Sequence, residues 1–261
     1  MLKVQVYSDL HLEFVKGFYN IKPTSEILIL AGDIGILDCN NFEPFLQYIS
    51  ENWKIIIYVL GNHEYYLEWS NYSKTKELYK DLFTKYKNIY LLDNEILNLT
   101  VNDEEYCIVG STLWSTVNQE YAKYLCCLKN INYYDSERNK VIKLPWYIYN
   151  SINQYETDYI KNIIRTNIDK KILVVTHYPT ISNKAVNTYY KTSEPEMIKL
   201  YNNDIELDRL KNNNLVCIAG HTHRSYDFEH NGVRYISNQK GYCENVSKKN
   251  KLSVSGEYYL F

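Results

Sequence analysis

The chain has 261 residues, of which 45% are hydrophobic and 23% charged, and its formal net charge is -2. It is long enough for one large domain with a sizeable core, or for two small ones, and its composition excludes wholesale disorder. No apolar run approaches the roughly 18 residues that a membrane-spanning helix needs. The near balance of 29 basic and 31 acidic residues removes one reason to expect a nucleic-acid partner, without excluding one.

Short β-branched runs bounded by glycine, asparagine or aspartate predict buried strands. In chain order the predicted strands are Lys3–Tyr7, Ile27–Ala31, Ile55–Leu60, Ile89–Leu92, Tyr106–Val109, Ile172–Thr176, Leu215–Ala219, Val233–Ile236 and Leu252–Leu260. Helices are predicted between several of them, at Phe42–Asn52, Leu67–Tyr86, Ile152–Asn167 and in two short stretches of Glu194–Leu210. This alternation predicts an α/β architecture, and the strand-to-strand steps of the second half argue against a purely parallel sheet.

The segment from about Thr116 to Tyr149 fits this alternation least well. It is rich in tyrosine and also holds two neighbouring cysteines and Trp146. We expect a single domain over residues 1–261, with this segment as an insertion that packs over or beside the core. A lid or binding loop is one interpretation, and a peripheral helical pair with no role in chemistry is the other.

Polar residues able to bind a metal directly follow five of the predicted strands. They are Asp9, His11, Asp33, Asn62, His177, His221 and His223, and His63 stands next to Asn62. Because ligands bind at the carboxyl edge of an α/β sheet, we expect these side chains to meet there. In an extended segment residues i and i+2 point to the same side, so Asp9 and His11 are expected to face one ion together. The same argument pairs His221 with His223.

Imidazole combined with carboxylate favours Zn, Fe, Mn and related ions over an oxygen-only calcium site. The seven side chains exceed what one four- to six-coordinate ion needs, and they suit two ions that share a bridging carboxylate. A single histidine at a strand end is more often a hydrogen-bonded surface or core residue. The metal prediction therefore depends on the whole set, in which glycines, apolar strands and paired spacings recur together.

The order Asp-x-His, Gly-Asp, Gly-Asn-His-Glu, His and Gly-His-x-His resembles that of the calcineurin-like metallophosphoesterases. The resemblance implies a four-layer α/β/β/α sandwich of mixed sheets, with a dinuclear site at the strand ends. It implies that one ion is bound by Asp9, His11, Asp33 and His223. The other ion would be bound by Asp33, Asn62, His177 and His221, so that Asp33 bridges the two. His63 would lie near the phosphate as the catalytic residue, either as a contact or as a proton donor.

Departures from the family pattern indicate which branch of the family the chain resembles. The sequence after Gly32-Asp33 lacks the second aspartate and the arginine of the phosphoprotein phosphatases, which argues against a protein Ser/Thr phosphatase. That aspartate would orient His63, and Asp38 is here the nearest acid. The segments 8–13 and 110–114 resemble a small microbial branch, where a second histidine often follows the His177 position. In this chain that residue is Tyr178, whose hydroxyl could bond a phosphate oxygen.

Ligating histidines usually donate their second ring N–H to a nearby acceptor. Glu13, Glu64 and Thr222 are the candidates in the sequence, although Glu64 suits the N-terminus of the following helix slightly better. The cysteines are scattered, and no secretory signal precedes the first strand. We therefore expect a cytoplasmic, intracellular protein with no membrane partner.

The resemblance implies a hydrolase of phosphate mono- or diesters that uses a metal-bridging hydroxide. Mn is the first candidate for the two ions, and Fe, Zn, Ni or Co are alternatives. The expected substrate is a small phosphate ester or a nucleotide. A nuclease is an alternative that the basic residues Lys240, Lys248, Lys249 and Lys251 support slightly. A catalytically silent binding scaffold is another, and the presence of every expected ligand argues against it.

Overall fold

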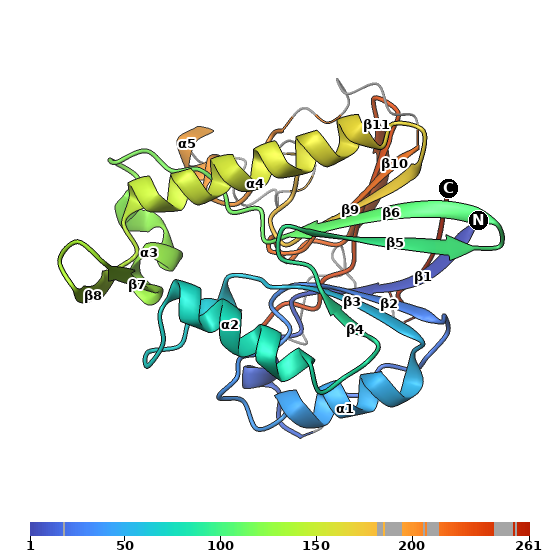
Figure 1. The fold of residues 1–261 in the computed structure, drawn as a ribbon, viewed down its shortest axis with the longest axis horizontal. Helices are drawn as coiled ribbons and strands as arrows, with labels where there is room; N and C mark the ends of the chain where they lie inside the picture. The colour runs from blue at the N-terminus through green and yellow to red at the C-terminus, as the bar shows by residue number, and fades with distance from the viewer. Residues whose placement is uncertain are drawn as a thin grey trace.

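Two mixed β-sheets packed face to face form the centre of the computed structural model, and helices cover their outer faces (Figure 1). The structure describes residues 1–17, 19–181, 185, 195–205, 207, 214–242, 253 and 255–261. The layers follow the order helices, sheet, sheet, helix, which confirms the predicted four-layer α/β/β/α fold. Among the described residues, no helix is both long and apolar enough to cross a membrane.

The first sheet has five strands in the order β13-β1-β2-β3-β4. Strands β1 to β4 run parallel, and β13 pairs antiparallel with β1. Their bounds are β1 Leu2–Tyr7, β2 Ile27–Ala31, β3 Ile55–Val59, β4 Ile89–Leu91 and β13 Glu257–Leu260. Its outer face is covered by the helices α1 (Phe42–Asn52) and α2 (Tyr72–Phe83). Strands buried on both faces need continuous apolar runs, which is why the sequence located them closely.

The second sheet has six strands in the order β11-β12-β10-β9-β6-β5. Their bounds are β5 Glu95–Val101, β6 Glu104–Ser111, β9 Lys171–Thr176, β10 Leu215–Ile218, β11 Tyr226–His230 and β12 Val233–Ser237. The outer strands β5 and β11 run antiparallel to their neighbours. The sequence pattern predicts neither β5 nor β11, because edge strands with one solvated face carry polar residues. Helix α4 (Trp146–Thr166) lies along the outer face and packs Ile160 and Ile164 onto it.

The core between the sheets comes from alternate residues of facing strands. Val4 and Val6 of β1 are fully buried in one cluster with Leu173 and Val175 of β9. Burying each such side chain contributes about 1.5–3 kcal/mol. This interface therefore fixes the position of one sheet relative to the other. The relative position of the sheets decides whether residues at the ends of β1 and β9 can share a site.

The predicted insertion consists of short elements that precede α4. They are η3 (Ala122–Tyr124), α3 (Cys126–Asn130) and the hairpin β7 (Asn132–Asp135) with β8 (Lys140–Lys143). The Asn132 amide donates to the carbonyls of Glu68 and Ser70, both at 2.9 Å, which ties the hairpin to the loop before α2. Helix α4 begins at Trp146, so the predicted start at Ile152 is wrong; the aromatic first turn follows Pro145 and hid the helical pattern.

Three further short helices complete the described elements: η1 (Leu12–Phe14), η2 (His63–Tyr65) and α5 (Pro195–Lys199). Helix α5 matches the first of the two short stretches predicted within Glu194–Leu210. The second stretch, and the start of the strand predicted from Leu252, lie largely outside the described residues.

Candidate metal centre

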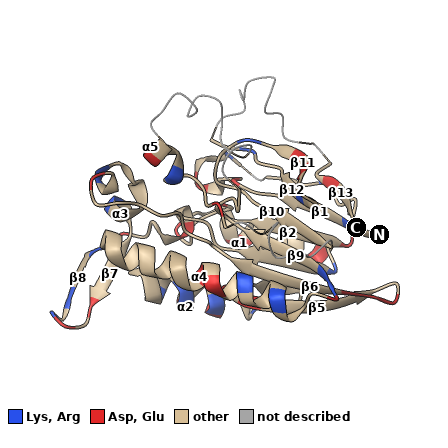
Figure 2. Cartoon of the chain, turned by 90° about the horizontal axis from the view of Figure 1, so that it is seen from above, with Lys and Arg blue, Asp and Glu red and all other residues tan. Residues whose placement is uncertain are grey.

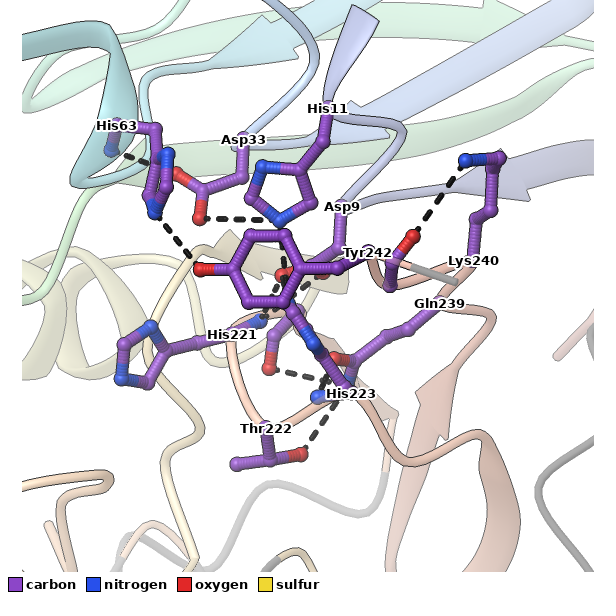
Figure 3. Close-up of polar contacts among 12 residues, drawn as sticks. Asp9, His11, Asp33, His63, His221, Thr222, His223, Gln239, Lys240 and Tyr242 are labelled. Atoms are coloured by element: carbon purple, nitrogen blue, oxygen red, sulfur yellow. Dashed lines mark hydrogen bonds and ion pairs between the residues drawn. The ribbon is translucent and has the colours of Figure 1, made fainter. Parts of the chain in front are cut away.

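All eight predicted site residues lie together where parallel strands of both sheets end. They follow β1 (Asp9, His11), β2 (Asp33), β3 (Asn62, His63), β9 (His177) and β10 (His221, His223). Figure 3 shows most of them converging from these loops. His230, which carried no motif, ends β11 and is exposed, outside the group.

One group of ligand atoms comes from Asp9, His11, Asp33 and His223. The Nε2 atom of His223 lies 3.4 Å from Asp9 Oδ1 and 3.1 Å from His11 Nε2. The same His11 nitrogen lies 3.8 Å from Asp33 Oδ2. Carboxylate oxygens and imidazole nitrogens thus surround one position from four side chains.

A second group comes from Asp33, Asn62, His177 and His221. The Oδ1 atom of Asn62 lies 2.9 Å from His177 Nε2 and 2.9 Å from His221 Nδ1. Those two nitrogens are 3.2 Å apart, and Asp33 Oδ1 lies 3.5 Å from His177 Nε2. Asp33 therefore has one oxygen in each group, which is the arrangement a bridging carboxylate needs.

The donor atoms are of the kinds that bind transition-metal ions. His177 donates its Nδ1–H to the Ala31 carbonyl at 3.0 Å, which directs Nε2 into the second group. Burial and the neighbouring His177 lower the pKa of His221 well below its ordinary value, so that this ring is neutral. Burial raises the pKa of Asp33, but the surrounding histidines outweigh it and hold that pKa well below its ordinary value. Burial lowers the pKa of His177, but Asp33 and Asp9 outweigh it and raise that pKa to about 9, so a bound ion would replace a proton on this ring. Imidazole nitrogens and an ionised carboxylate are the donors that such ions bind.

The backbone is left-handed, not extended, at five of the seven proposed ligands. The φ angles are 52° at Asp9, 47° at His11, 52° at Asp33, 71° at His221 and 51° at His223. The argument from extended i, i+2 spacing is therefore wrong, because the chain turns sharply where each strand ends. The predicted pairing of His221 with His223 is also wrong, since these two residues face different groups. Left-handed non-glycine residues cost roughly 1–3 kcal/mol each and cluster at functional sites.

Glycines beside the ligands allow loops to pack directly on the carboxylates. A Cβ at Gly61 would collide with the Asp33 side chain, and one at Gly220 would lie 2.7 Å from Asp9 Oδ2. In return, the backbone N–H of His221 donates to Asp9 Oδ1 at 3.1 Å. The glycines of the sequence motifs thus permit the close approach that brings loops of different strands together.

Glu13, one of the three candidates from the sequence, is the carboxylate that orients His11 and His63. Its Oε1 atom lies 3.1 Å from Nδ1 of His11 and 3.1 Å from Nδ1 of His63. Burial raises the pKa of Glu13, but these two hydrogen bonds lower it below the ordinary value. Asp38, the nearest acid in sequence, instead accepts a hydrogen bond from Trp69 Nε1 at 2.8 Å on the exposed surface.

Two further expectations about neighbouring residues are wrong. Glu64 does not cap the helix that follows; its buried carboxylate accepts from the backbone N–H groups of Gly61 at 2.8 Å and Ile34 at 2.8 Å. It therefore joins the loops after β2 and β3. The Thr222 hydroxyl accepts from Gln239 at 3.2 Å rather than from a ligating histidine.

Tyr242 covers the first group and was missed by sequence reasoning. Its hydroxyl lies 2.9 Å from His63 Nε2, and its ring centroid lies 4.3 Å from that of His11 and 4.5 Å from that of His223 (Figure 3). The preceding Gly241 donates its N–H to the Asp9 carbonyl at 2.9 Å, which fixes the loop. No motif surrounds Tyr242, so only the fold could reveal it.

Cys127 of the insertion connects two residues that support the second group. Its Sγ atom lies 3.3 Å from the Tyr66 hydroxyl and 3.2 Å from the Tyr178 hydroxyl. Tyr66 accepts from the Asn62 amide at 2.9 Å, and the Tyr178 ring lies 3.9 Å from the His221 ring. The Tyr178 hydroxyl thus contacts Cys127, and its bond to a phosphate oxygen stays a prediction.

A cavity of about 550 Å³ opens onto the metal centre, a volume typical of small-molecule sites. It reaches the ligands Asp33, Asn62, His221 and His223 together with His63. Residues 124–127 and Asn130, from the segment predicted as an insertion, also line it.

Comparisons with known proteins agree with this geometry. The family model described as calcineurin-like phosphoesterase matches residues 2–225. An uncharacterized protein of Acanthamoeba polyphaga mimivirus is 31% identical over 258 residues, which cover 90% of this chain and 89% of that protein. The crystal structure of phosphopantetheinyl hydrolase from Mycobacterium tuberculosis is similar in fold, with a TM-score of 0.60 and 18% identity over 92% of this chain and 89% of that chain. Because the family match spans most of its length, the chain belongs to the calcineurin-like phosphoesterases, a family of metal-dependent phosphoester hydrolases.

Proposed function

We propose that this protein hydrolyses phosphate mono- or diesters with two metal ions bound on either side of Asp33. The observation that carries the proposal is the position of the two Asp33 carboxylate oxygens, 3.8 Å from His11 Nε2 and 3.5 Å from His177 Nε2. When bound, two ions lower the pKa of a water molecule and offset the charge of the phosphoryl oxygens. In the reaction a water oxygen forms a bond to phosphorus, the bond to the ester oxygen breaks, and the alcohol leaves with a proton.

His63 is the proposed donor of that proton. Glu13 accepts from Nδ1 of His63 at 3.1 Å and so directs Nε2 toward the cavity. Burial lowers the pKa of His63, but the carboxylates of Asp33 and Glu13 outweigh burial and raise it above its ordinary value. A donor placed in this way contributes about 10²–10⁴-fold to the rate. The Tyr242 hydroxyl lies 2.9 Å from Nε2 of His63, so it has to move before this nitrogen can donate to the ester oxygen.

We propose Mn for both ions, with Fe, Zn, Ni or Co as alternatives, because all suit imidazole and carboxylate ligands. The proposed substrate is a small phosphate ester or a nucleotide. Of the basic residues that supported a nuclease, Lys248, Lys249 and Lys251 lie outside the described residues. Over the described elements in Figure 2, basic and acidic residues are interspersed, which favours a small substrate over a nucleic acid.

The proposal is tested with the protein loaded with Mn²⁺, using p-nitrophenyl phosphate and bis-p-nitrophenyl phosphate as substrates. We expect metal-dependent release of nitrophenolate from at least one of them. Asp33→Asn should lose both ions and at least about 10³-fold in rate, whereas His63→Gln should keep both ions and lose about 10²-fold. Bound metal is measured by inductively coupled plasma mass spectrometry on the same samples.

Asp38→Asn provides the matched control, since it makes the same chemical change five positions along the chain at an exposed carboxylate. It should keep both ions and the wild-type rate. Full activity in Asp33→Asn and His63→Gln would refute the mechanism. Two bound ions without hydrolysis of either ester would favour the binding scaffold.

A further inference from the structure

One wall of the cavity, which adjoins the metal ligands, is made of rings and aliphatic side chains from three separate segments. Tyr124, Leu125 and Cys126 come from the insertion, while Leu200 and Tyr201 follow α5 and Tyr66 follows η2. Tyr124 is 51% exposed, so its ring is available to a ligand without being displaced from the core. An ester whose phosphate binds at the metal centre can place its leaving group against this wall.

Two tyrosine rings that line the cavity lie at similar angles to the His221 ring. The Tyr178 ring lies 3.9 Å from the His221 ring with an interplanar angle of 31°. The Tyr201 ring lies 6.1 Å from the same His221 ring with an angle of 30°. Aromatic rings pack favourably in such arrangements, so Tyr201 places a ring beside the metal centre.

Along its described residues, the same wall presents no cation to a second anionic group. Among the described residues that line it, from Tyr66, Tyr124 to Cys127, Asn130, Tyr178, Leu200 and Tyr201, none is charged. The Asn130 side chain is its one amide. An additional phosphate or carboxylate on the leaving group would lose its hydration here without gaining a cation.

We propose that the substrate is an ester of a single phosphate whose leaving group carries an uncharged planar ring, bound against Tyr124 and Tyr201. This inference rests on the proposed hydrolase function and adds the class of ester that the site selects. A nucleobase and a simple aryl group share the required chemistry, and both bind through their ring faces.

The experiment compares esters that differ in the ring alone. Adenosine 5′-monophosphate and ribose 5-phosphate have the same phosphate and the same primary alcohol as leaving group, so their intrinsic reactivity is matched. We expect kcat/KM to be about tenfold higher for the nucleotide, chiefly through a lower KM. A second pair, benzyl phosphate and propyl phosphate, tells a simple aryl group from a nucleobase.

Two variants locate the ring on the wall. Tyr124→Ala and Tyr201→Leu should each lower the nucleotide-to-ribose ratio of kcat/KM at least about threefold. Tyr134→Ala removes an exposed tyrosine from the hairpin of the same insertion, outside the cavity, and should leave the ratio unchanged. Binding of adenosine, measured by calorimetry, tests the wall without any hydrolysis.

The outcomes separate the two proposals. Equal kcat/KM within both ester pairs, or a ratio that neither cavity variant changes, would overturn the ring preference and leave the hydrolase standing. Adenosine binding that weakens in Tyr124→Ala, with no hydrolysis of any ester including bis-p-nitrophenyl phosphate, would support the ring site and overturn the hydrolase.

Discussion

At the scale of single residues, the proposed ligands depend on partners that never touch an ion themselves. Asn62 and His221 are 159 residues apart, and each is supported by a tyrosine that contacts Cys127. Burial raises the pKa of the Cys127 thiol to about 12, so it stays protonated and acts as a neutral contact between the two phenols. Its role is to position residues of the second group through Tyr66 and Tyr178.

Cys127→Ala should therefore weaken the second ion more than the first. Removing a buried hydrogen-bonding partner should also lower the free energy of unfolding by about 1–3 kcal/mol. A competitive metal titration resolves the two binding steps, and urea unfolding of the metal-free protein gives the stability change. Cys126→Ala, at the exposed neighbouring cysteine, should change neither quantity. Equal loss of both ions in Cys127→Ala would contradict the assignment to the second group.

At the scale of elements, α4 carries a carboxylate into the core. Glu156 is buried, and its Oε2 atom accepts from the Trp114 N–H at 3.0 Å. Its Oε1 atom has no hydrogen-bond partner among the described residues. Burial raises the pKa of Glu156 to about 8. Folding therefore favours the protonated acid, and α4 contributes its full stability only where that proton is retained.

The sign of the resulting pH dependence follows from this raised pKa. Below the ordinary value of 4.5 both folded and unfolded chains hold the proton, and as pH rises toward 8 the unfolded chain alone releases it. Stability is therefore lost between these pH values. Glu156→Gln should remove that loss and exceed the wild type at pH 9 by about 2–4 kcal/mol in urea unfolding. Asp158→Asn, on the exposed face of α4, should keep the wild-type profile; identical profiles for Glu156→Gln and wild type would refute the argument.

At the scale of the whole molecule, each proposed ion joins the two sheets. The first group combines Asp9 and His11, which follow β1 of the first sheet, with His223, which follows β10 of the second. A bound ion is thus expected to act as a cross-link between the sheet edges, in addition to the apolar core between them. Ligands that bind only the folded chain stabilise it by mass action.

Removal of metal should accordingly lower the thermal unfolding temperature. At a free metal concentration 100 times the dissociation constant, one ion adds about 2.7 kcal/mol, which for a chain of this size corresponds to about 5 °C or more. Scanning calorimetry with and without a chelator measures the difference. Asp33→Asn should abolish it and Asp38→Asn should retain it. An unchanged unfolding temperature in chelated wild type would contradict binding at this site.

Local sequence was enough to predict the buried strands, helix α1 and the identity of the residues that gather at the strand ends. β2 and α1 were predicted with their observed bounds. Apolar runs and helical periodicity depend on neighbours within a few positions, which the sequence displays directly. The four-layer arrangement followed from the resemblance to a family, not from periodicity.

Contacts between distant segments were decided by the tertiary structure alone. Glu13 lies 50 residues from His63 in sequence and Tyr242 lies 179 residues from it, yet both bond its ring. The left-handed turns that aim the ligands likewise depend on loops packing against one another. No local pattern encodes such pairs, because their geometry is set by how the two sheets are packed. Residue types and their order along the chain thus determined what gathers at the centre, and the packing of the sheets decided which atoms face each other there.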